Sequence, residues 1–111
     1  PRLVGMARAK EMLLLGEKVT ADDAAGWGLI HRSVDGAALD GAAADLLARL
    51  AAGPTVAIGL AKQAINYAQH VPLNQAMTQE LFNLELSCRT SDFKEGLTAF
   101  REERAPDFTG R

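Results

Sequence analysis

The sequence predicts an all-α fold of five to six short helices, arranged like a bundle, with at most one short strand. Aromatic residues make up only 5% of the chain, and much of its apolar share is alanine, which favours closely packed helices over a sheet core. Apolar residues recur at helical spacing in most segments. The connections between these segments are short, so successive helices should pack against one another. With 111 residues, the chain is expected to form a single domain over residues 1–111.

The first two predicted helices are recognised by their ends. A helix over residues 6–15 has an apolar side and stops at Gly16, which can enter the left-handed region without steric cost. Thr20 is a suitable N-cap for a brief second helix over residues 21–27. Residues 29–34 form the only plausible strand, and it is short.

Three longer segments follow, separated by proline or glycine. Asp35 can cap a helix that runs to about Ala52, and Gly53-Pro54 then breaks the pattern. The next helix has a face of small residues, which permits close approach to a neighbour: Ala57, Ala61, Ala64, Ile65 and Ala68. Val71-Pro72 opens a further helix with an apolar stripe that consists of Leu73, Met77, Leu81, Leu84 and Cys88. This stripe predicts core packing and an inert, buried thiol at Cys88.

The last predicted helix begins near Asp92. Asp92 and Glu95 have the spacing of a capping box, and helix should end near Arg104 because Pro106 disfavours it at the residue before. One helix face carries Phe93, Leu97 and Phe100. We expect this face to dock the helix, so that replacing a buried Phe100 by Ala would cost about 3–5 kcal/mol.

Composition excludes several function classes. The formal net charge of −2 argues against nucleic-acid binding, and a small anionic ligand would need a local basic cluster. A single cysteine forms no intramolecular disulfide. His31 and His70 lie far apart without a cysteine cluster nearby, so no metal site is expected. No signal-peptide pattern or long apolar run is present, which makes the cytoplasm the default location and argues against a membrane span.

Catalytic motifs are also missing from the pattern. The chain has no G-x-S-x-G, no P-loop and no G-x-G-x-x-G. The carboxylate pairs Asp22-Asp23 and Glu102-Glu103 have obvious roles at helix ends. The chain starts at Pro1, which either removal of an initiator Met or truncation of a longer protein would explain.

Three runs resemble the C-terminal part of the enoyl-CoA hydratase/isomerase (crotonase) family. D-F-K-E-G-L-T-A-F-R-E-E-R-A-P-D-F, from Asp92 to Phe108, resembles the family pattern D-x-x-E-G-x-x-A-F-x-E-K-R-x-P-x-F. Upstream, L-L-L-G-E-K-V-T-A-D-D-A-A-G-W-G-L-I-H-R and A-A-G-P-T-V-A-I-G-L-A-K-Q-A-I-N resemble family runs in the same order. The resemblance covers essentially the whole chain but only the C-terminal part, somewhat under half, of a typical member.

The resemblance implies a role in acyl-CoA chemistry. Family members hydrate enoyl-CoA thioesters or shift their double bond, as in fatty acid metabolism, and their C-terminal helices build trimers or hexamers. CoA enters as part of the substrate, and no separate cofactor is implied. The oxyanion hole and the catalytic glutamates of the family lie upstream of the matched region. No catalytic residue is therefore expected in this chain, which should be inactive alone.

The resemblance also places the CoA edge of the site on the last helix. Phe100 matches the family aromatic that packs near adenine. The family pattern has a phosphate-binding Lys where this chain has Glu103, whose carboxylate would repel a phosphate. Arg101, Arg104 and Lys94 are the available cations. The competing interpretation is that the two arginines are solvated, helix-end residues.

A second hypothesis of another class stays open. The chain could be a free-standing, non-catalytic helical module that self-associates or joins full-length relatives. The genomic sequence just upstream of Pro1 would distinguish the two, because a start codon favours the module and an in-frame spiral domain favours the enzyme. The sequence leaves open the acyl chain length, the choice between hydratase and isomerase, and the oligomer size.

Overall fold

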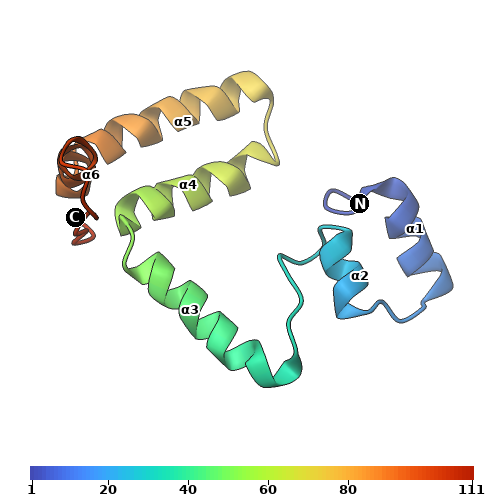
Figure 1. Ribbon diagram of the computed structural model, residues 1–111. Helices are drawn as coiled ribbons and strands as arrows, with labels where there is room; N and C mark the ends of the chain where they lie inside the picture. Colours follow the sequence, from blue (N-terminus) through green and yellow to red (C-terminus); the bar gives the residue numbers. More distant parts are fainter. The chain divides into compact units, whose positions relative to one another are not determined.

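The all-α prediction is confirmed by a computed structural model that describes residues 1–111. It contains six α-helices, one short 3-10 helix over Gly36–Ala38 and no strand. The α-helices are α1 (Gly5–Leu15), α2 (Ala21–Gly26), α3 (Leu39–Ala51), α4 (Thr55–Ala68), α5 (Leu73–Cys88) and α6 (Ser91–Arg101) (Figure 1). Two compact units divide the chain, residues 1–42 and residues 43–111.

The unit of residues 1–42 follows its predicted local signals at both helix ends. Gly16 ends α1 in the left-handed region, with φ of 66°. The Thr20 side chain caps α2 by accepting from the Asp23 backbone N–H at 3.1 Å. The Arg8 guanidinium lies 4.5 Å from the centre of the Trp27 ring, a cation–π contact from α1 to the end of α2.

The predicted strand at residues 29–34 is wrong. The backbone N–H groups of Leu29 and Ile30 bond back to the Ala24 carbonyl, at 2.9 and 3.3 Å, and so continue the turn that ends α2. No second extended segment is available to pair with these residues, and a strand needs such a partner. Asp35 precedes the 3-10 turn, but its side chain makes no capping bond.

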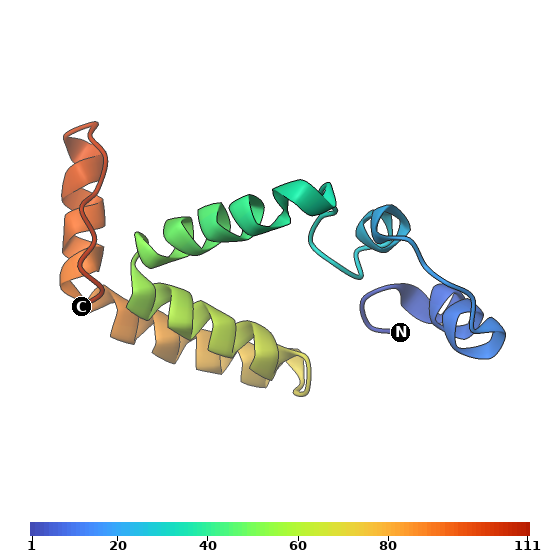
Figure 2. The ribbon, with the colours of Figure 1, turned by 90° about the horizontal axis from the view of Figure 1, so that it is seen from below.

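In the unit of residues 43–111, α4 and α5 lie side by side as a helical hairpin (Figures 1 and 2). Asn83 of α5 is buried and donates to the Leu60 carbonyl of α4 at 3.1 Å. Its own side-chain oxygen accepts from the Gln79 amide at 3.0 Å. The hairpin is therefore held in part by a satisfied polar contact. Ala61, Ile65 and Ala68 of the small-residue face of α4 remain exposed.

The apolar stripe of α5 is exposed in this chain, contrary to the prediction of core packing. Leu73 is 75% exposed and Leu81 is 66% exposed, and Cys88 is half-buried rather than buried. Helical spacing identifies a face that disfavours water, but it does not say which molecule covers that face. No single helix is both long and apolar enough to span a membrane. Residues 36–51 and 55–68, taken together as a bent pair of helices, have the length and composition that a span needs, and nothing more than that.

Candidate functional site

The last 22 residues form the region in which sequence analysis placed the candidate site. The N-cap of α6 is Thr90, whose hydroxyl accepts from the Phe93 backbone N–H at 3.1 Å. The predicted capping box of Asp92 and Glu95 is therefore wrong. Since Thr90 already serves the first turn, both carboxylates are available for other partners.

Asp92 binds the end of the chain. Residues 105–111, here named the C-terminal strap, turn back and run alongside α6 (Figure 2). The Asp92 carboxylate is buried and accepts from the backbone N–H groups of Thr109 at 2.7 Å and Gly110 at 2.8 Å. In return, the Arg111 carbonyl accepts from the Asp92 N–H at 3.0 Å and from the Ser91 hydroxyl at 2.6 Å. With the Thr109 hydroxyl, which donates to Asp92 at 3.3 Å, five hydrogen bonds tie the strap to the start of α6.

Glu95 binds the first part of the strap, at Asp107, and the preceding residue Arg104. Its carboxylate accepts from both terminal nitrogens of Arg104, at 2.6 and 3.0 Å, and from the Asp107 backbone N–H at 2.8 Å. Arg104 also donates to Glu102 at 2.7 Å. The hydrogen bonds from Arg104, followed by the one from Asp107, lower the pKa of Glu95 to about 2. The same carboxylates raise the pKa of Arg104.

The strap determines which face of α6 is buried. Asp92 and Ala99 are the buried residues of the helix, at 3% and 1% exposure. Phe108 of the strap packs over Gly96, where an added Cβ would lie 3.6 Å from its ring. Phe100 is 84% exposed, so the prediction that it is buried is wrong. The strap carries hydrogen-bond donors and occupies the Asp92 side, which leaves Phe100 on the uncovered side.

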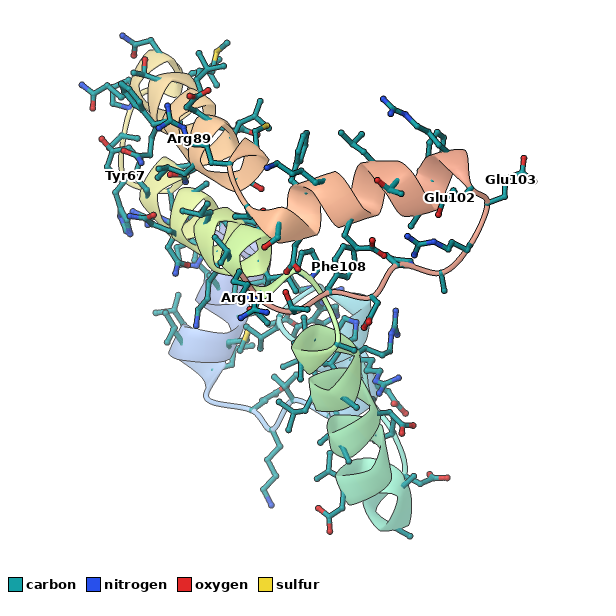
Figure 3. The ribbon with its side chains drawn as sticks, turned by 90° about the vertical axis from the view of Figure 1, so that its left-hand side faces the viewer. Tyr67, Arg89, Glu102, Glu103, Phe108 and Arg111 are labelled. Carbon is teal, nitrogen blue, oxygen red and sulfur yellow. The ribbon has the colours of Figure 1, made fainter.

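Helix α6 ends three residues earlier than predicted. Its last residue is Arg101, and Glu103 takes the left-handed conformation with φ of 52°. The Arg104 N–H bonds to the Ala99 carbonyl at 3.1 Å, and the Glu103 N–H bonds to the Phe100 carbonyl at 3.4 Å. This is a Schellman motif with Glu in the position where glycine is usual. Figure 3 shows the chain turning back at Glu103 and passing Phe108 to reach Arg111.

The four predicted CoA-binding residues fall into two groups. Lys94 and Arg101 are seven residues apart on α6, which places them on one side of the helix about two turns apart, and Phe100 is turned about 100° from Arg101. All three are exposed. Arg104 lies beyond the helix and its guanidinium is paired with Glu95 and Glu102. Lys94, Phe100 and Arg101 are thus exposed on α6 without an ion-pair partner, whereas Arg104 is engaged by two carboxylates.

A shallow apolar pocket of about 250 Å³ adjoins the strap contact. It is lined by Pro54, Ala57, Ser87, Thr90, Asp92, Phe93, Gly96, Leu97 and Phe108. This pocket was not predicted from the sequence. Phe108 and Gly96 are both in the family pattern, but nothing local indicates that they meet. No group of three or more His, Cys, Asp or Glu side chains is placed to hold a metal ion.

A family profile described as enoyl-CoA hydratase/isomerase matches residues 1–111. The chain is 40% identical over its whole length to a 1,2-epoxyphenylacetyl-CoA isomerase of Escherichia coli, of which it covers 42%. It is 36% identical to a 2,3-dehydroadipyl-CoA hydratase of the same organism, with 99% of this chain and 43% of that protein aligned.

The fold gives the same result. The crystal structure of an enoyl-CoA hydratase from Bacillus anthracis superposes with a TM-score of 0.92 at 34% identity, over 100% of this chain and 43% of that one. The chain thus spans less than half the length of the relatives that it matches. Both sequence and fold agree over its whole length, and the chain therefore belongs to the enoyl-CoA hydratase/isomerase family.

Proposed function

We propose that this chain is the C-terminal helical part of a cytoplasmic enoyl-CoA hydratase/isomerase family protein that acts on acyl-CoA thioesters. Its role is to supply oligomer contacts and the CoA edge of the site. The reaction of the whole protein is hydration of an enoyl-CoA or a shift of its double bond. Support comes from the family match over residues 1–111. The chain also covers only 42% of the 1,2-epoxyphenylacetyl-CoA isomerase of Escherichia coli, which is the coverage expected for one part of a longer family member.

The observation that carries this proposal is the exposed face of α6. Phe100 is a large aromatic side chain with 84% of its surface exposed. It precedes Arg101 on α6, and Lys94 is exposed on the same helix, in a chain with net negative charge. An exposed aromatic ring next to two cations suits a ligand that combines a planar base with phosphates. The adenine and phosphates of CoA have this chemistry.

Arg101 is the leading phosphate ligand among the three cations. Arg104 already makes a bidentate pair with Glu95 and a further bond to Glu102. A phosphate would have to displace these charge-assisted bonds before it could recruit Arg104. Arg101 and Lys94 have no such carboxylate partner among the ion pairs of the chain.

The names of the two Escherichia coli relatives support CoA as the shared part of the ligand. One is a 1,2-epoxyphenylacetyl-CoA isomerase and the other is a 2,3-dehydroadipyl-CoA hydratase. The acyl groups differ while CoA is common to both. A site on α6 that contacts only the CoA end is compatible with either acyl group.

Oligomer contacts are proposed on the stripe of α5. Leu73, Met77, Leu81 and Leu84 are each more than half exposed. A contiguous apolar face of this kind marks an interaction surface. Self-association to a trimer or hexamer would cover it, and sedimentation that shows only monomer at micromolar concentrations would contradict this part of the proposal.

The test of CoA binding compares CoA with 3′-dephospho-CoA by calorimetric titration. Arg101→Gln should weaken CoA about tenfold while leaving 3′-dephospho-CoA unchanged, because one charge-assisted contact to the phosphate is lost. Phe100→Ala should weaken both ligands, since both contain adenine. Arg89→Gln is the matched control, because Arg89 is exposed but paired with Glu85 on α5. Equal affinity of all four proteins for CoA would exclude a CoA site on α6.

The same proposal implies that the chain alone has no hydratase activity. Its carboxylates nearest the α6 face are already engaged, Asp92 and Glu95 with the strap and Glu102 with Arg104. Hydration needs donors at the developing oxyanion and positioned acid–base groups. Turnover of crotonyl-CoA that is lost on mutating Glu102 or Glu103 would place an active site within these helices and refute the assignment.

A further inference from the structure

We propose that Asp92 is a positioning residue: it clamps the C-terminal strap between α6 and the start of α4, and so sets the orientation of the CoA-binding face of α6. This inference rests on the proposed function, because the face in question carries Lys94, Phe100 and Arg101. Asp92 itself lies opposite Lys94 and Arg101 and about 80° around the helix from Phe100, on the side that the strap covers, and it touches no ligand.

The buried carboxylate of Asp92 depends on the strap for its hydrogen bonds. A carboxylate that is 97% shielded from water is costly unless its oxygens are satisfied. Here each oxygen has its own backbone donor, Thr109 for Oδ1 and Gly110 for Oδ2. The arrangement requires two acceptors side by side, which a carboxylate offers and an amide does not.

The strap lies against two helices, α4 and α6. Gly110 has φ of 77°, and a Cβ added to it would lie 2.6 Å from the Thr55 hydroxyl at the start of α4. Phe108 lies against Gly96 of α6 and lines the apolar pocket together with Pro54 and Ala57. The strap therefore lies against both α6 and the start of α4.

Helix α6 has few close backbone contacts with the other helices. Its backbone approaches α5 at only a few positions and does not come within 8 Å of the α4 backbone, Cα to Cα. An apolar pocket of about 250 Å³ separates Phe93 and Leu97 from Pro54 and Ala57. The angle of α6 consequently depends on the strap, which Asp92 holds at the start of the helix.

A small tilt of α6 at Asp92 would displace the residues at the far end of the helix. Phe100 lies eight residues beyond Asp92, about 12 Å along the axis at 1.5 Å per residue. A tilt of about 10° at Asp92 would move Phe100 and Arg101 by roughly 2 Å, several times the ~0.5 Å within which a binding group must be held. Loss of the clamp should therefore disrupt a phosphate contact at the far end of the helix.

The experiment measures the preference of the full chain for CoA over 3′-dephospho-CoA as a ratio of dissociation constants. Asp92→Asn should reduce this ratio about tenfold, toward one, because one oxygen acceptor becomes a donor and faces a backbone N–H. Asp107→Asn makes the same charge change on the strap, at an exposed residue, and should keep the ratio. A loss of folded protein lowers both affinities equally and leaves the ratio unchanged, so the readout separates positioning from stability.

A second variant reaches the strap without touching Asp92. Gly110→Ala places a Cβ against Thr55 and should also reduce the ratio, while Gly59→Ala, in open space on α4, should not. A wild-type chain that prefers CoA, with variants Asp92→Asn and Gly110→Ala that keep the preference, overturns this inference and leaves the proposed function standing. A wild-type chain with no preference overturns the phosphate contact itself, and the inference with it.

Discussion

Glu103 offers a direct test of the turn that ends α6. It is the only residue other than glycine with positive φ, at 52°. The left-handed conformation costs an L-residue roughly 1–2 kcal/mol because Cβ approaches the following carbonyl oxygen. Glycine escapes this cost but loses about 0.5–1 kcal/mol of additional conformational entropy on folding. Glu103→Gly should therefore stabilise the unit of residues 43–111 by about 0.5–1 kcal/mol.

The assay is denaturant unfolding followed by circular dichroism, with a thermal scan in parallel. A gain of this size in a chain of 111 residues raises Tm by about 2–4 °C. Hydrogen exchange at the Arg104 amide should slow as well, because this amide bonds to Ala99 within the turn.

Glu103→Ala is the matched control. It removes the carboxylate but keeps the Cβ, so its stability should stay within about 0.5 kcal/mol of the wild type. If the glycine and alanine variants are equally stable, the left-handed strain at Glu103 is not real and the assigned turn is wrong. If both are more stable than the wild type by the same amount, the side-chain charge is the cause.

Three further predictions concern the same end of the chain. Phe100→Ala should change the free energy of unfolding by less than about 0.5 kcal/mol, since the ring is 84% exposed; a loss of 3 kcal/mol would mean that the ring is buried. Glu103→Lys should tighten CoA but not 3′-dephospho-CoA, because it replaces a repelling carboxylate by a cation, and equal effects on both would contradict a phosphate contact. The pKa of Glu95 is lowered to about 2 from the ordinary 4.5, so its contribution to stability is present above pH 4.5 and is lost as the pH falls toward 2. Glu95→Gln should remove that pH dependence from the unfolding curve, whereas a curve unchanged by this variant would exclude the Glu95–Arg104 pair as its source.

Some features of this chain were predicted because their causes are local. The left-handed end of α1 at Gly16 and the cap of α2 at Thr20 depend on a few neighbouring residues, and the structure confirms both. The family could also be predicted from the sequence, because the run from Asp92 to Phe108 is long and matches a pattern typical of that family. The sequence by itself therefore determined the helical class and the family.

Only the tertiary structure decided how α6 is used. Helical spacing of Phe93, Leu97 and Phe100 predicted the apolar face as the buried one, yet Asp92 and Ala99 are the buried residues. The reason is that an aspartate near a helix start can accept from its own first turn or from any other donor that reaches it. Which donor arrives depends on where residues 105–111 run, and this path is set by contacts distant in the sequence, with Gly96 and with Thr55.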